Sequence, residues 1–120
     1  MPPKIVSSVS DEETFKSIVF SNEDPRLHIV DVYTQWCGPC NQMMPLFKSL
    51  SINVDFFEER VNILQVCAAT IGDFEKYEGT SQPTFLLYRE GSLVAEVKGA
   101  NAPVLLKTID QNLPPPPDTD

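Results

Sequence analysis

Residues 28–33 are the segment that most limits the folds open to this 120-residue chain. The run His-Ile-Val-Asp-Val-Tyr is rich in β-forming residues and is apolar at both alternating positions. Because a strand points successive side chains to opposite faces, this strand must be covered on both faces. It is the best candidate for the central strand of a sheet, and residues 63–68 (Ile-Leu-Gln-Val-Cys-Ala) are typical of a second buried strand.

Segments with helical periodicity separate these candidate strands. The first helix is expected from about Asp11 to Phe20, with Ser10 and Glu13 as a capping box at its start. A second helix is expected to open at residues 37–40 and to carry Pro45 in its interior, where proline kinks a helix. A third, shorter helix follows the second buried strand. The apolar stripes of the second and third helices are, in chain order, Met43, Phe47, Leu50 and Val54, and then Ile71, Phe74 and Tyr77.

The rest of the chain predicts a hairpin, a helix and a tail. Thr84–Tyr88 and Leu93–Lys98 are two candidate strands whose short connection fits an antiparallel hairpin. A helix is expected over Ala102–Asn112, with Asn101 as its cap and Pro103 in the first turn, where a missing N–H is harmless. Prolines 114–117 end this helix and are expected to extend as polyproline II, either as a plain linker or as a docking motif.

Residues 4–9 have a weak strand character and precede the first helix. The order β-α-β-α-β-α-β-β-α then predicts an α/β fold, a three-layer α/β/α sandwich around a mixed central sheet. We expect a single domain over residues 1–113 and a proline-rich acidic tail over residues 114–120. Hydrophobic residues make up 42% of the chain, which is enough for a packed core without disulfide or metal cross-links.

The charge balance narrows the class of partner. Nine Lys and Arg residues against seventeen Asp and Glu residues give a net charge of -8. The chain therefore offers no cationic surface for nucleic acid or for an anionic membrane, and neither is expected as a partner.

The longest apolar runs are four residues, whereas a membrane-spanning helix needs about 20. The start of the chain does not lead into an apolar stretch of signal-peptide type, so we expect a reducing, cytoplasmic location.

The motif Cys37-Gly38-Pro39-Cys40 stands between the expected central strand and the second helix. A cysteine at a helix N-terminus meets free N–H groups and the positive end of the helix dipole, and both stabilise a thiolate. Cys37 is therefore the expected nucleophile. Cys40 follows within one turn, near enough to attack a mixed disulfide on Cys37, and Gly38 and Pro39 keep the link short and stiff.

A metal or haem role for this cysteine pair requires residues that the chain does not place nearby. A zinc site requires four ligands, and beyond the pair only Cys67 and His28 are candidates, on different expected strands. A c-type haem site needs histidine after the second cysteine, where Asn41 stands. We therefore expect no metal and no cofactor, with a packing role for the pair as the alternative. Cys67 is expected to be a small buried core residue, with a regulatory thiol as the alternative, and His28 to be structural.

The pentapeptide from Trp36 to Cys40 resembles the active-site sequence of the thioredoxin family in full, and the resemblance extends from about Ile5 to Leu113. It implies a thioredoxin fold and leaves thiol–disulfide oxidoreductase activity as an expectation. It also implies that Pro83 is a cis-proline facing the dithiol, which lets the backbone of Gln82 pair with an extended substrate; an ordinary trans turn is the alternative. The expected substrate-binding residues are Trp36, Gly38, Pro39, Gln82 and Pro83.

Asp31, six residues before Cys37, corresponds to the buried aspartate of that family. A carboxylate on a doubly covered strand loses solvation, which raises its pKa and suits it to accept a proton from Cys40. We therefore count Asp31 with Cys37 and Cys40 as the candidate catalytic residues; an aspartate that reaches water at the strand end is the alternative. Asn41 and Gln82 depart from the residues common in the family, which leaves the redox tuning open.

Three further stretches, residues 30–33, 75–79 and 97–103, resemble the thioredoxin-like light chains of axonemal outer-arm dynein and the related ciliary thioredoxin domains joined to nucleoside diphosphate kinase-like modules. This resemblance implies a ciliary axoneme location and, as partners, a dynein heavy chain and other outer-arm subunits besides protein thiols and disulfides. The alternative is a free cytosolic thioredoxin that acts as a general protein-disulfide reductase.

Overall fold

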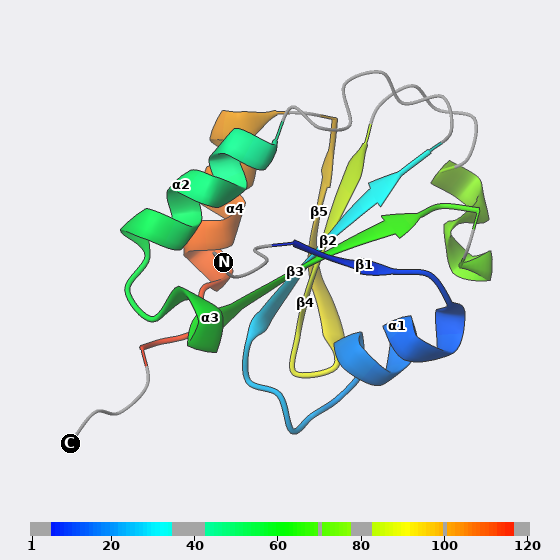
Figure 1. Cartoon of the computed structure of the whole chain (residues 1–120), viewed down its shortest axis with the longest axis horizontal. Coiled ribbons are helices and arrows are strands. Elements are labelled where there is room, and N and C mark those ends of the chain that lie inside the picture. Colours follow the sequence, from blue (N-terminus) through cyan, green and yellow to red (C-terminus); the bar gives the residue numbers. More distant parts are fainter. Residues whose placement is uncertain (1–5, 35–42, 70, 78–82, 100, 117–120) are drawn as a thin grey trace.

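A five-stranded mixed sheet forms the centre of the computed structural model, which describes residues 6–34, 43–69, 71–77, 83–99 and 101–116 (Figure 1). The strand order is β1-β3-β2-β4-β5. Neighbours among the first three strands are parallel, whereas β4 runs antiparallel to both β2 and β5. The strands are β1 (Val6–Val9), β2 (Leu27–Tyr33), β3 (Val61–Cys67), β4 (Thr84–Arg89) and β5 (Ser92–Lys98).

The central strand β2 is confirmed as the strand that the apolar pattern of residues 28–33 predicted. It lies between β3 and β4, and six of its seven residues are buried. The hairpin of β4 and β5 is confirmed too, with Glu90 and Gly91 between the strands. Both residues have positive φ, 54° and 82°, as a type I′ hairpin turn requires.

Helices cover both faces of the sheet and complete the three layers predicted from the sequence (Figure 1). The helix α1 (Glu12–Val19) and the 3₁₀ helix η1 (Gly72–Tyr77) pack on one face, around Val30, Val32 and Leu64. The opposite face is covered by α2 (Met44–Asn53), α3 (Phe57–Arg60) and α4 (Ala102–Asn112). The buried side chains that α2, α3 and α4 contribute to this second core are Phe47, Leu50, Phe57, Leu105 and Ile109.

The cap of α1 differs from the expected capping box. Asp11, not Ser10, is the N-cap: its backbone is extended and its Oδ2 accepts a hydrogen bond from the Thr14 N–H at 2.8 Å. This hydrogen bond holds the pKa of Asp11 below its ordinary value. Two good capping residues stand side by side here, and Asp11 takes the role because its backbone is extended and its side chain reaches the Thr14 N–H.

Pro45 was expected in the interior of the second helix. Within the described residues α2 begins at Met44 and Pro45 is its second residue, whereas the expected start of this helix at residues 37–40 lies outside the described residues. The first N–H groups of a helix have no partner within it, and a proline there costs no hydrogen bond. The sequence also missed the four-residue helix α3, whereas α4 has the predicted bounds and the predicted cap, with Asn101 accepting from the Val104 N–H.

The chain beyond α4 stays against the body of the protein for at least one residue. Leu113 follows the helix with extended backbone, and Pro114 is buried. The carbonyl of Pro114 accepts a hydrogen bond from Arg60 Nε at 2.9 Å, which joins this segment to α3. Within the described residues, no helix has the length and apolar character needed to cross a membrane.

Candidate functional site

The segment that carries the cysteine motif joins the end of β2 to the start of α2. Residues 35–42 lie outside the described part of the chain, and they include Trp36, Cys37, Gly38, Pro39 and Cys40. Gln82 lies outside it as well, and with it the Gln82–Pro83 peptide bond whose cis form was expected. The described residues at this end of the sheet include Tyr33, Thr34, Cys67, Pro83 and Thr84, with Asp31 two residues before the end of β2.

The strand register brings Pro83 to the end of the sheet where the cysteine segment begins. Val32 of β2 pairs with Thr84 of the antiparallel strand β4. Pro83, one residue before Thr84, therefore lies beside Tyr33, the last residue of β2. The carbonyl of Pro83 accepts a hydrogen bond from the Gly99 N–H at 2.8 Å, which fixes it against the end of β5. A proline at the first position before a strand is thus held in place although it donates no hydrogen bond itself.

Asp31 is a buried residue of β2, two residues before the end of that strand. Its exposed fraction is 1%, and its neighbours in the sheet are Gln65 of β3 and Phe85 of β4. It lies on the same face as Ile29, because the two are separated by one residue, and Ile29 belongs to the core under α2 and α4. Asp31 therefore faces the helix that the cysteine segment enters.

Burial determines the electrostatics of Asp31. Loss of water raises the pKa of its carboxyl to about 7. Among the described residues, its Oδ1 has no hydrogen-bond partner. A carboxyl with this pKa is partly protonated at neutral pH, and it can therefore both accept and return a proton there. The expected burial is confirmed, whereas the proton transfer with Cys40 stays a prediction.

The structure separates the two residues that a zinc site would have added to the cysteine pair. His28 lies near the start of β2, whereas Cys67 ends β3 and pairs with Tyr33. Five residues of strand separate the two levels, or about 17 Å. Within the described ranges, no three His, Cys, Asp or Glu side chains gather as a metal ion requires.

Both residues have surroundings that the sequence did not predict. Cys67 is half-buried at the end of the sheet where residues 35–42 begin, and it is not the fully buried core residue that was expected. His28, expected only to be structural, has two polar neighbours: its Nδ1 lies 3.1 Å from Asn62 Nδ2 and its Nε2 lies 3.8 Å from a carboxylate oxygen of Asp24. Burial lowers the pKa of His28 and so favours its neutral form.

Two buried threonines at this end were missed in the sequence. Thr34 is 4% exposed and Thr84 is 5% exposed, beside the strand ends that flank the cysteine segment. Their signal is weak, because threonine is common in strands whether or not it has a role there. Their position after β2 and after Pro83 is the only feature that could have singled them out.

Comparison with known proteins decides the family. A family model described as Thioredoxin matches residues 6–111. The chain belongs to the thioredoxin family. Its fold agrees: the crystal structure of thioredoxin NaTrxh from Nicotiana alata superposes with a TM-score of 0.74 at 25% sequence identity, over 95% of this chain and 97% of that chain.

Two curated relatives of this thioredoxin-family chain are larger proteins. Thioredoxin domain-containing protein 6 of Mus musculus is 47% identical over 87 residues, which cover 72% of this chain and 26% of that protein. The Dynein 16 kDa light chain, flagellar outer arm, of Chlamydomonas reinhardtii is 36% identical over 97 residues, covering 78% of this chain and 62% of that protein. The chain thus spans about a quarter of the first relative and three fifths of the second.

Proposed function

We propose that this chain is a thioredoxin-like light chain of ciliary outer-arm dynein whose Cys37-Cys40 dithiol exchanges with protein disulfides or senses their redox state. The similarity to the flagellar outer-arm light chain, over 78% of this chain, supports the assignment to the motor. The observation that carries the chemistry is the buried Asp31, with its raised pKa, at the end of the sheet where the cysteine segment begins.

The proposed exchange has two steps. The thiolate of Cys37 attacks one sulfur of a partner disulfide, forms a mixed disulfide and releases the other partner sulfur as a thiolate. Cys40 then loses its proton and attacks the Cys37 sulfur, which breaks the mixed disulfide and releases the second partner thiol. The partner disulfide is reduced by two electrons, and Cys37 and Cys40 become a disulfide that an external dithiol must reduce again.

Asp31 has a specific part in the second step. Cys40 must be deprotonated to attack, and a carboxylate near neutrality with a pKa of about 7 is well matched to receive that proton. The neutral acid can then return a proton to the partner thiolate or to solvent. Pro83 and Trp36 complete the surface on which the partner backbone docks in this proposal.

Association with the motor and thiol exchange are separable. We expect that packing holds the light chain on a dynein heavy chain, so the association does not need a disulfide. The alternative, a free cytosolic thioredoxin acting as a general reductase, shares the fold with proteins such as NaTrxh but has no need of the motor. The partners and the axonemal location are therefore tested first.

Two affinity purifications from ciliated cells test the proposal. The Cys37→Ser/Cys40→Ser double variant, purified under reducing conditions, is expected to recover the dynein heavy chain. The Cys40→Ser variant, which stops at the mixed disulfide, is expected to retain a small set of axonemal partners. Loss of the heavy chain together with a broad set of trapped cytosolic proteins would favour the free reductase instead.

The chemistry is checked with the purified chain. Wild type is expected to reduce an accessible protein disulfide when supplied with an external dithiol, and Cys37→Ser is expected to abolish that rate. An unchanged rate in Cys37→Ser would show that Cys37 is not the nucleophile.

A further inference from the structure

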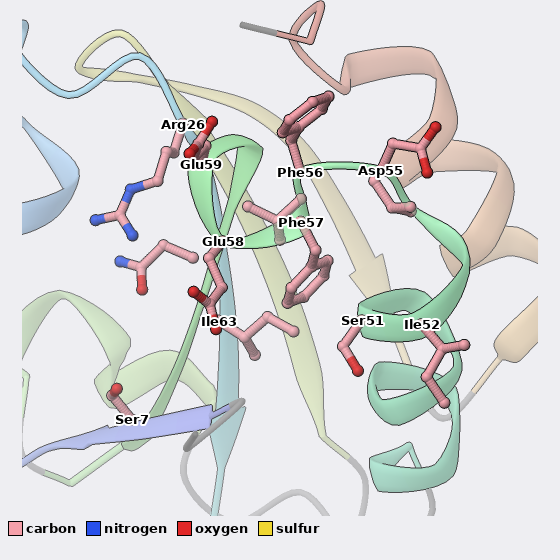
Figure 2. A pocket seen from close by; sticks show the side chains of 13 residues that line it. Ser7, Arg26, Ser51, Ile52, Asp55, Phe56, Phe57, Glu58, Glu59 and Ile63 are labelled. Carbon is pink, nitrogen blue, oxygen red and sulfur yellow. The ribbon is translucent and has the colours of Figure 1, made fainter. Parts of the chain in front are cut away.

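A groove lies at the end of the sheet opposite the one where β2 ends at Tyr33. Its walls are the last turn of α2, the helix α3 and the first residues of β3, with the edge strand β1 on its far side (Figure 2). Its volume is about 970 Å³, at the upper end of the range seen for ligand sites in proteins. The residues used below are Ile52, Asp55, Phe56, Glu58 and Glu59, which we call the α2–α3 groove.

Apolar side chains are unusually exposed in the α2–α3 groove. Ile52 at the end of α2 is 81% exposed, and Phe56 just before α3 is 48% exposed. The groove continues inward to Phe57, which is 8% exposed and belongs to the core under α2 and α4. One aliphatic and one aromatic side chain of the groove lining are therefore exposed to water, beside the buried ring of Phe57.

The backbone holds Phe56 in this exposed position at a cost. Its φ of 57° and ψ of 39° place it in the left-handed region, which is a genuine outlier for a bulky residue without glycine's freedom. The carbonyl of Phe56 accepts a hydrogen bond from the Glu59 N–H at 3.0 Å, so this conformation starts α3. Strain of this kind persists where the surrounding structure imposes it, and it concentrates at binding sites.

The rim of the groove is acidic. Asp55, Glu58 and Glu59 are exposed, and no salt bridge between described residues engages any of them. The two nearby arginines are already occupied. Arg26 forms a close pair with Asp24, with Nη2 and Oδ2 2.8 Å apart, and Arg60 donates to the backbone carbonyls of Pro114 and Asp55.

We propose that the α2–α3 groove is a docking surface for a basic amphipathic helix of a partner protein. Apolar anchors of that helix cover Ile52 and Phe56, and its Lys and Arg residues pair with Asp55, Glu58 and Glu59. A second copy of this chain does not fit this role, because the net charge of -8 and the same acidic rim make two copies repel. An anionic membrane is disfavoured by the same charge.

The position of the groove leaves the other end of the molecule free. β2 and β3 are parallel, so the start of β3 at the groove and the end of β2 at the cysteine segment lie at opposite ends of the sheet. α2 runs between them over ten residues, or about 15 Å. A partner held in the groove thus does not cover Pro83 or Tyr33. The inference goes beyond the proposed function, because it needs neither the dithiol nor a dynein partner.

A synthetic peptide provides the test with the full chain. The probe is a helix of about 18 residues, or five turns, with Leu and Phe on one face and Lys and Arg on the other. A scrambled peptide of identical composition is the matched control. We expect saturable binding of the amphipathic peptide, weaker binding at high salt, and amide shift changes in NMR spectra that concentrate on residues 51–63.

Four variants separate the groove from general attraction to an acidic protein. Ile52→Ser and Phe56→Gly are each expected to weaken binding about tenfold, the loss of one buried apolar anchor. Glycine also accepts a positive φ without strain, so Phe56→Gly is expected to fold normally. The matched controls away from the groove are Leu93→Ser on β5, which is 52% exposed in the wild type, and Glu13→Lys on α1.

A charge exchange makes the test sharper. Glu58→Lys/Glu59→Lys is expected to lose affinity for the basic peptide and to gain affinity for the same peptide with glutamate in place of its Lys and Arg residues. Equal binding by wild type and the groove variants would overturn the proposal, as would an equal loss in the two control variants. Sedimentation could instead show that the wild-type chain is a dimer and that Ile52→Ser is a monomer. That result would assign the groove to a second copy of the chain and would overturn the proposal as well.

Discussion

Replacement of Asp31 by asparagine tests the buried carboxyl through stability. Asparagine keeps the size of the side chain but does not titrate in this range. In the folded protein the Asp31 carboxyl keeps its proton up to a pH of about 7, because burial raises its pKa from the ordinary value of 3.8. Between these two pH values the folded chain therefore binds more protons at this residue than the unfolded chain does. The free energy of unfolding of wild type must accordingly fall as the pH rises through this window.

The size of the effect follows from the shift. A difference of about three pKa units corresponds to about 4 kcal/mol between the two ends of the window, as an order of magnitude. Part of this fall is complete by pH 5, where the unfolded carboxyl has already ionised. Between about pH 5 and pH 8 we expect wild type to lose about 2 to 3 kcal/mol relative to Asp31→Asn. Only the difference between the two proteins is attributed to Asp31, because they share all other titrating groups.

Urea unfolding at a series of pH values measures this difference. Both proteins carry Cys37→Ser and Cys40→Ser, so that ionisation of this pair and a disulfide between its two cysteines do not contribute. Asp31→Asn is expected to be the more stable protein above about pH 7, and its advantage is expected to vanish toward low pH. A difference in unfolding free energy that stays constant from pH 5 to pH 8 would refute the assignment of a raised pKa to Asp31.

Three further predictions address the cap, the core and the buried histidine. Asp11→Ala is expected to lower the free energy of unfolding by about 1 kcal/mol through loss of the α1 cap, whereas Ser10→Ala changes it by less than about 0.5 kcal/mol; thermal melts of both decide which residue caps. Phe47→Ala removes a fully buried ring that packs edge-on against Phe85, with the two ring centroids 6.1 Å apart. It is expected to lower the free energy of unfolding in urea by about 3 to 5 kcal/mol. The control Ile52→Ala, at an exposed position, is expected to lower it only slightly. Because burial lowers the pKa of His28 from 6.5, the unfolded chain takes up a proton there first, and stability falls as the pH drops below that value. His28→Leu is expected to remove this acid-dependent loss, and a wild-type curve parallel to that of the variant below pH 6.5 would contradict it.

The sequence predicted correctly those helices and strands whose residue pattern is compatible with only one kind of secondary structure. Residues 28–33 are apolar at both parities and became the central strand, and Asn101 followed by Pro103 marked the start of α4. Burial of Asp31 followed from the same pattern, since a residue within a doubly covered strand has no path to water. The strand and the helix start rested on local periodicity and on the chemistry of helix caps alone, whereas the resemblance to the thioredoxin family also pointed to Asp31.

The features that the sequence did not predict depend on competition or on tertiary contacts. Ser10 and Asp11 are both good caps, and only the backbone geometry decides between them. The helix α3 is one turn long, too short for periodicity, and its start rests on the left-handed conformation of Phe56, which no sequence rule assigns to phenylalanine. The half-exposure of Cys67 depends on where β3 ends, and strand ends are the least predictable part of a pattern.

The hydrogen bonds of Arg60 have a practical consequence for shortened forms of the chain. Its guanidinium joins the carbonyl of Pro114 to that of Asp55, so the segment after α4 and the loop before α3 share one anchor. A truncation at Leu113 removes one side of that anchor and exchanges it for water. Such a truncation therefore removes the tail and also alters the loop before α3 that carries Phe56. A change in partner binding after the truncation can come from either of these two effects. Substitution of the prolines after residue 114 leaves the anchor in place and distinguishes them.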